Sequence, residues 1–132
     1  MRYVFDLDGT LCTPTDGSYE TAKPIASRIA VVNNLYHEGH HITIYTARGM
    51  GRHNNDRESA IAEFEELTKK QLEQWEISFH ELVLGKVSGD VYVDDKGSKD
   101  TSFFCDQSPS RIVESKKRSL LKAVSWRVIA VL

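Results

Sequence analysis

Two carboxylates, Asp6 and Asp8, follow an apolar run at residues 3–5. A short apolar run bounded by glycine predicts a buried strand, and residues two apart in a strand share a face. Two like charges on one face repel each other and are costly to bury unpaired. Carboxylate oxygens are what Mg²⁺ prefers, so the pair predicts a magnesium site. The plainer interpretation is a polar strand-to-turn junction, since Asp-Gly is a common turn pair.

Three later apolar runs also end in polar or charged groups. These groups are Thr46 at the end of residues 42–46, Lys86 after residues 79–84, and Asp94 and Asp95 after residues 91–93. Each run is short and apolar, which predicts a strand. In open parallel sheets the ligand site lies beyond the carboxyl ends of the strands. We therefore expect all of these groups at one sheet edge.

Together these groups could hold a cation beside a phosphate. Three carboxylates, those of Asp6, Asp8 and one of the later pair, would form an oxygen site for Mg²⁺. Thr46 and Lys86 would supply a donor and a positive charge to the phosphate oxygens. A phosphoryl group held there would be open to in-line attack by a carboxylate, which gives an aspartyl-phosphate. Asp8 could protonate the leaving oxygen and then deprotonate the attacking water.

Helical patterns separate the expected strands. Pro24 suits the first turn of a helix, whose apolar residues recur at helical spacing up to Gly39. A second, longer helix begins at Asp56 and carries apolar residues up to Trp75 on one face. A strand, a helix and a strand in this order predict a right-handed βαβ unit with parallel strands. We expect an α/β fold with a mainly parallel central sheet.

Composition narrows the class of protein. The chain has 132 residues and a formal net charge of −2, which predicts one domain and no nucleic-acid partner. Its two cysteines, Cys12 and Cys105, lack metal-type spacing and favour a reduced, intracellular setting. No signal-peptide pattern precedes the first strand. We expect a cytoplasmic protein.

The motifs at the expected strand ends resemble those of a known superfamily. Asp6-Leu7-Asp8-Gly9-Thr10-Leu11, Thr46, Lys86 and Asp94-Asp95 stand in the order of the four motifs of haloacid dehalogenase-like hydrolases. The resemblance covers roughly residues 3–104. It implies a Rossmann-like three-layer α/β/α domain with a mainly parallel central sheet. The intervals between the motifs leave no room for a large cap.

The resemblance also implies a role for each motif residue. Asp6 would be the nucleophile and a metal ligand, and Asp8 the general acid/base, which also ligates Mg²⁺ through its backbone carbonyl. Because the dehalogenase branch lacks this second Asp, Asp8 indicates phosphate chemistry. The remaining roles are phosphate binding by Thr46 and Ala47, orientation of the nucleophile and charge neutralisation by Lys86, and completion of the metal site by Asp94 with support from Asp95.

Three segments resemble a narrower group. Residues 19–24, 46–50 and 85–96 are similar to small phosphatase-like members found among capsular polysaccharide biosynthesis proteins. That similarity implies a small phosphorylated metabolite as the substrate, with a sugar or polyol phosphate favoured.

Without a cap, only loops would cover the site. These are residues 12–22 and 49–55, or a neighbouring subunit of a homo-oligomer. Tyr19, Arg48 and His53 are the candidates for substrate contact, although Tyr19 equally suits packing on the domain edge.

The family-like pattern ends near residue 106, so we expect a core over residues 1–106 and a helical tail over 107–132. The tail suits an amphipathic helix packed on the sheet. It also resembles the opening of a small predicted-membrane domain, with basic residues before the apolar run and a Trp at the junction. A spanning helix needs about 20 apolar residues, which this run does not reach. The second interpretation is therefore membrane association through residues 111–132, at the inner membrane face.

Two other functions fit part of this pattern. A receiver-like regulatory domain has the same size, parallel sheet, acidic pair and lysine. It would carry its phosphorylated Asp at the end of a middle strand, where this chain has Thr46. A catalytically silent phosphate-binding domain would keep all of the groups. Turnover of a phosphate ester distinguishes an enzyme from both.

Overall fold

The computed structural model describes residues 1–106. The chain divides into two compact units, one spanning Met1–Tyr92 and the other beginning at Val93. Each unit is described by itself. The predicted tail over 107–132 and its membrane association lie outside the described residues.

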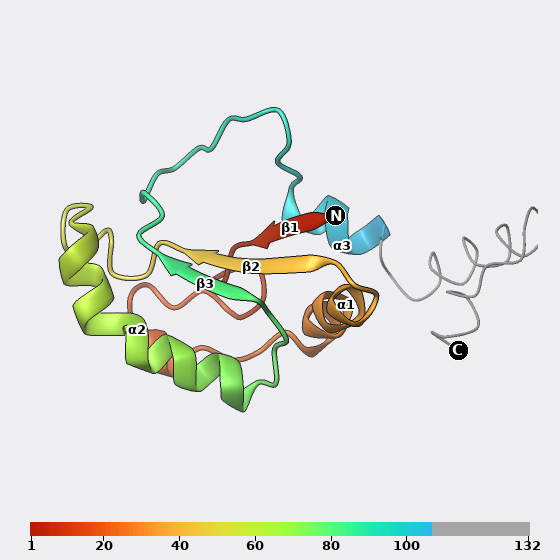
Figure 1. Cartoon of the computed structure of the whole chain (residues 1–132). Coiled ribbons are helices and arrows are strands. Elements are labelled where there is room, and N and C mark those ends of the chain that lie inside the picture. Colours follow the sequence, from red (N-terminus) through yellow and green to blue (C-terminus); the bar gives the residue numbers. More distant parts are fainter. Residues whose placement is uncertain (107–132) are drawn as a thin grey trace, which may run out of the picture. The chain divides into compact units, whose positions relative to one another are not determined.

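Within the described residues, the sheet has three parallel strands in the order β1-β2-β3 (Figure 1). The strands are β1 (Arg2–Phe5), β2 (His41–Thr46) and β3 (Glu81–Leu84). The register pairs Phe5 with Ile44 and Thr46 with Leu84, so the carboxyl ends of all three strands lie at one edge. The predicted α/β fold with a parallel sheet is confirmed at this level.

Two helices connect the strands, as the apolar periodicity predicted. Helix α1 (Ala26–His37) packs against β2, and α2 (Arg57–Gln74) packs against β3. Helix α1 ends where Gly39 adopts a φ of +94°, which favours glycine. Within residues 1–106, neither these helices nor any other has the length and apolar character needed to cross a bilayer.

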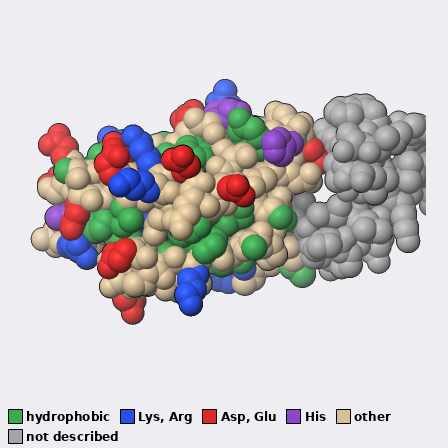
Figure 2. All heavy atoms as spheres, turned by 90° about the horizontal axis from the view of Figure 1, so that it is seen from below, with side chains coloured by type: hydrophobic (Ala, Val, Ile, Leu, Met, Phe, Trp, Pro, Cys, Tyr) green, Lys and Arg blue, Asp and Glu red, His purple; other side chains and the backbone are tan. Residues whose placement is uncertain are grey.

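The face of the molecule in Figure 2 carries interspersed charges. Lys and Arg side chains lie among Asp and Glu side chains there, and apolar side chains show between them. This mixture is typical of a solvated surface.

The central strand β2 links the core to the site. Its residues alternate between half-buried and buried, and Ile42, Ile44 and Thr46 share the buried face. Thr46 therefore extends this face to the carboxyl edge of the sheet, where its side chain is only 1% exposed. A hydroxyl in such a place needs a hydrogen-bond partner, and the backbone N–H of Arg48 donates to it at 3.2 Å.

The predicted fourth strand at residues 91–93 is wrong. Val91 and Val93 are 79% and 90% exposed, and residues 85–99 contain no strand or helix in the described structure. The Tyr92 hydroxyl donates to the Val87 carbonyl and accepts from the Gly89 N–H. Local contacts thus close this segment into a loop. A run of three apolar residues is too short to override them.

The second unit contains one helix within its described part. Helix α3 (Asp100–Asp106) buries Phe104. It follows the turn at residues 94–97, in which backbone N–H groups of Lys96 and Gly97 donate to Asp94 Oδ1.

Candidate functional site

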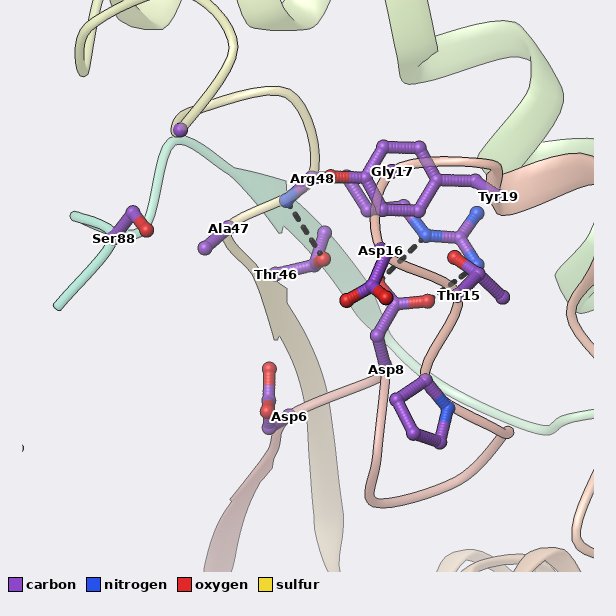
Figure 3. A pocket seen from close by; sticks show the side chains of 12 residues that line it. Asp6, Asp8, Thr15, Asp16, Gly17, Tyr19, Thr46, Ala47, Arg48 and Ser88 are labelled. Atoms are coloured by element: carbon purple, nitrogen blue, oxygen red, sulfur yellow. Dashed lines mark hydrogen bonds and ion pairs between the residues drawn. The ribbon is translucent and has the colours of Figure 1, made fainter. Parts of the chain in front are cut away.

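A pocket of about 270 Å³ lies at the carboxyl edge of the sheet. Figure 3 shows the side chains of Asp6, Asp8 and Thr46 around it, as the strand-end pattern predicted. The loops that follow β1, β2 and β3 supply the other lining residues, which are Pro14, Thr15, Asp16, Gly17, Tyr19, Ala47, Arg48, Gly51 and Ser88.

A tight turn after β1 presents Asp8 to the pocket. The carbonyl of the buried Leu7 accepts hydrogen bonds from the N–H groups of Thr10, Leu11 and Cys12, at 3.0, 2.8 and 3.2 Å. Gly9 adopts a φ of +80°, which side chains rarely tolerate, and its N–H donates to the Cys12 carbonyl. The Asp-Gly pair thus forms a turn, and its Asp8 is also part of the pocket wall.

Asp6 is a partly buried carboxylate with one nearby cation. Lys86 Nζ lies 3.8 Å from Asp6 Oδ1. Burial raises the pKa of Asp6 above its usual range, even though Lys86 and hydrogen bonds from Leu7 and Thr10 oppose the shift. Burial therefore outweighs the ammonium in its effect on the pKa of Asp6. An oxygen donor in that position suits an additional cation such as Mg²⁺.

Lys86 is held close to the end of β3. Gly85 turns the chain with a φ of +96°, and the Lys86 N–H donates to the Thr46 carbonyl at 3.2 Å. The ammonium lies 4.4 Å from the centre of the Tyr92 ring. Tyr92 was not among the predicted site residues. The sequence signal for this contact was an aromatic residue six positions after the lysine at the strand end.

Asp8 forms a bidentate ion pair with Arg48. Arg48 Nε donates to Asp8 Oδ2 at 2.9 Å, and Nη2 donates to Oδ1 at 3.0 Å. The Arg48 side chain is fully buried, whereas that of Asp8 is 21% exposed. Arg48 lines the pocket, and its guanidinium binds an acidic residue of the site. Its contact with substrate stays a prediction.

Helix α2 supplies two buried polar partners to Arg48. Nη1 donates to Thr68 Oγ1 at 3.2 Å and to Gln71 Oε1. Gln71 Nε2 in turn donates to the Tyr19 carbonyl at 2.8 Å. The sequence prediction placed only apolar residues on this helix face. Thr68 and Gln71 lie four and seven positions after the buried Phe64, and this spacing was the signal that they share its face.

Tyr19 lines the pocket and also packs on its surroundings, so both interpretations of this residue have structural support. Its hydroxyl accepts a hydrogen bond from the Gly49 N–H at 2.9 Å. Its ring lies 4.9 Å from the Arg48 guanidinium carbon and meets the Phe64 ring edge to face. Gly49 has a φ of +79°, and a Cβ there would clash with Phe64. The loop after β2 therefore needs glycine at this position.

His53 lies outside the pocket lining. Its Nε2 lies 2.7 Å from Glu63 Oε1, and Arg52 Nη1 donates to Glu63 Oε2 at 2.7 Å. The hydrogen bond from His53, together with Arg52, lowers the pKa of Glu63. His53 thus ties its loop to α2, and its contact with substrate stays a prediction.

Cys12 contributes a thiol beneath Asp8. Its Sγ lies 3.4 Å from Asp8 Oδ1, and burial beside that carboxylate raises the pKa of Cys12 to about 12. The group therefore stays a neutral thiol that donates to Asp8.

Two pocket residues, Thr15 and Asp16, were not predicted individually. Among the described residues, the Thr15 hydroxyl is a buried side-chain oxygen without a hydrogen-bond partner. Asp16 adopts a φ of +50°, which is uncommon outside glycine. The loop over residues 12–22 was expected to cover the site, but its composition did not indicate which side chains face the pocket.

Asp94 and Asp95 belong to the second unit. Backbone hydrogen bonds from Lys96 and Gly97 lower the pKa of Asp94, and Asp95 is exposed. Within residues 1–106, no three His, Cys, Asp or Glu side chains are grouped closely enough to hold a metal ion. The part of Asp94 and Asp95 in a metal site therefore stays a prediction.

The comparisons with known proteins bear on the fold. No family model and no curated protein matches this sequence. A crystal structure of a structural-genomics target from Vibrio cholerae is similar, with a TM-score of 0.72 and 23% identity. The match covers 78% of this chain and 86% of that chain. At this identity the similarity shows a shared α/β fold and nothing about activity.

Proposed function

We propose that this protein is a Mg²⁺-dependent phosphatase that hydrolyses a small phosphate monoester through an aspartyl-phosphate on Asp6. The observation that supports it best is the pocket at the sheet edge, where Asp6, Asp8 and Thr46 meet and Lys86 lies 3.8 Å from Asp6. Phosphoryl transfer needs such a set, because its catalysis depends on positioned charges and donors.

The reaction would proceed in two displacements. An Asp6 oxygen attacks the phosphorus, the bond from phosphorus to the ester oxygen breaks, and Asp8 gives that oxygen its proton. Water then attacks the phosphorus of the aspartyl-phosphate and passes a proton to Asp8. The bond to the Asp6 oxygen breaks, and inorganic phosphate leaves.

The phosphate oxygens would be bound by the ends of β2 and β3. The Thr46 hydroxyl accepts from the Arg48 N–H, so its own O–H can donate to a phosphate oxygen. The Ala47 backbone lines the same pocket. Lys86 would orient Asp6 and offset the charge of the phosphate.

The donor set fits Mg²⁺. Burial raises the pKa of Asp6, so a cation beside this carboxylate would stabilise its charged form. The Asp6 carboxylate and the Asp8 backbone carbonyl would hold the ion. Ligation by Asp94, with support from Asp95, stays a prediction. A bound Mg²⁺ would neutralise charge on the phosphate.

We propose further that the fold is the three-layer Rossmann-like core of haloacid dehalogenase-like hydrolases, without a large cap. The loop with Thr15 and Asp16 would then face the leaving group. An unpartnered hydroxyl and a carboxylate suit a substrate rich in hydroxyl groups. A sugar or polyol phosphate is therefore favoured.

The substitution Asp6→Asn tests the function. It removes the nucleophile with almost no change in volume, so turnover of p-nitrophenyl phosphate with Mg²⁺ should be abolished while the circular dichroism spectrum is retained. Asp90→Asn, the same change at an exposed loop position, should keep wild-type turnover. Full activity in the Asp6 variant would exclude this mechanism. A wild type that binds phosphate without turnover would favour a regulatory or catalytically silent phosphate-binding domain.

A further inference from the structure

Arg48 is a buried cation whose donors are all used inside the protein. A guanidinium has five N–H groups. Nε donates to Asp8, Nη1 donates to Thr68 and Gln71, and Nη2 faces both Asp8 and Cys12. Each N–H group therefore has an acceptor, and none remains for a substrate. The function of Arg48 must be exerted on the groups that it already binds.

The geometry points to Arg48 as the positioning residue of Asp8. This inference rests on the proposed function, in which Asp8 moves the proton. A buried ion pair is by itself weak evidence for stability, because removing both charges from water is costly. A planar guanidinium that donates to both oxygens of one carboxylate fixes the orientation of that carboxylate as well as its position. Both residues line the pocket, but the Asp8 side chain is 21% exposed whereas that of Arg48 is fully buried.

Helix α2 and the first loop share this network. Gln71 binds Arg48 through its oxygen and the Tyr19 carbonyl through its nitrogen. The Tyr19 hydroxyl accepts from the Gly49 N–H, next to Arg48 in the chain. Both loops that flank the pocket are thus tied to the group that holds Asp8. Arg48 positions Asp8 relative to Asp6 and Thr46, which β1 and β2 place independently.

The test compares Arg48→Lys with wild type, using p-nitrophenyl phosphate and Mg²⁺. Lysine keeps the positive charge but cannot donate to both Asp8 oxygens in the planar, bidentate geometry of the guanidinium. A misplaced proton carrier should lower kcat by up to about 100-fold, while KM changes little. The p-nitrophenolate leaving group needs little protonation, so the first displacement continues and the second slows. Acid-quenched protein should therefore carry one phosphoryl group on Asp6 by mass spectrometry, at a higher fraction than wild type.

Arg52→Lys is the matched control, because Arg52 is an exposed arginine in the same loop that pairs with Glu63. It should keep wild-type kcat and wild-type phosphoenzyme. Gln71→Leu is a second variant that leaves Arg48 in place and removes one of its anchors. The same changes, smaller in size, are expected there, and this variant decides the matter if Arg48→Lys does not fold.

The outcomes separate the two proposals. If Asp6→Asn is inactive and Arg48→Lys matches wild type, the positioning role is wrong and the phosphatase stands. A lower kcat without accumulated phosphoenzyme would mean that Arg48 only maintains the fold, which also overturns the inference. If wild type neither hydrolyses phosphate esters nor forms a phosphoenzyme, the proposed function fails, and the positioning role fails with it.

Discussion

Lys86 Nζ lies 3.8 Å from Asp6 Oδ1, and these two residues follow the ends of the first and last strands of the described sheet. The parallel register brings the two ends to one edge although they are far apart in the chain. The Lys86 ammonium opposes the rise in the pKa of Asp6 that burial causes.

We predict that Lys86→Met strongly impairs phosphoryl transfer. Burial raises the pKa of Asp6 and the ammonium lowers it. Without the ammonium the pKa rises further, so a larger fraction of this nucleophile is protonated. Loss of a positioned charge at such a site costs about 100-fold in kcat. Steady-state kinetics with p-nitrophenyl phosphate measure the effect. Lys86→Arg, which keeps the charge, should retain more activity, and equal losses in both variants would show that charge is not what matters.

We predict that the ring of Tyr92 matters more to the site than its hydroxyl group. The ring centre lies 4.4 Å from Lys86 Nζ, whereas the hydroxyl binds only its own loop. An exposed cation–π contact contributes about 0.5–1 kcal/mol, or about a two- to fivefold change in kcat/KM. Tyr92→Leu should show this loss and Tyr92→Phe should not. A larger loss in the Phe variant would instead assign the effect to the loop hydrogen bonds.

The polar groups at the ends of the strands could be predicted from sequence, because each strand end is marked by the residues next to it. The run before Asp6 and the run that ends at Thr46 are short, apolar and separated by a helix, so a parallel sheet brings them to one edge. Whether residues 91–93 pair with a strand depends on competing contacts. The Tyr92 hydroxyl closes its own loop, and no local pattern indicated that.

The role of Arg48 depends on partners that only the fold brings near. An arginine in a Gly-rich loop after a strand suits substrate binding as well as internal pairing. The acceptors Thr68 and Gln71 lie on a helix far along the chain, and the internal pairing depends on their burial beside Arg48. The pairing of His53 could not be predicted for the same reason, because its partner Glu63 also lies on that helix.

We predict that the Glu63 carboxyl titrates below its usual range. The hydrogen bond from His53 is the largest cause, and Arg52 adds to it. A carboxyl with a lowered pKa stabilises the folded state above its unfolded pKa, and that contribution is lost as the pH falls through the folded pKa. Carboxyl-carbon NMR titration measures the value directly.

His53→Ala should raise the pKa of Glu63 back toward its usual range, and Arg52→Lys should raise it less. Because this cluster lies outside the pocket lining, kcat should stay near wild type in both variants. An unchanged Glu63 titration in the His53 variant would mean that the contact is not maintained in solution.

We predict that Mg²⁺ stabilises the folded protein through Asp6. A ligand that binds only the native state adds RT ln(1 + [L]/Kd), which is about 2.7 kcal/mol at a free concentration 100 times Kd. The midpoint of thermal unfolding should therefore rise with MgCl₂, and phosphatase activity should be lost with a chelator and restored by excess metal. Asp6→Asn should lose most of the rise, because it removes the buried carboxylate whose negative charge a bound cation would stabilise. Asp90→Asn should keep the rise. If NaCl of equal ionic strength stabilises the protein as much as MgCl₂ does, the effect is general screening, and the magnesium site is wrong.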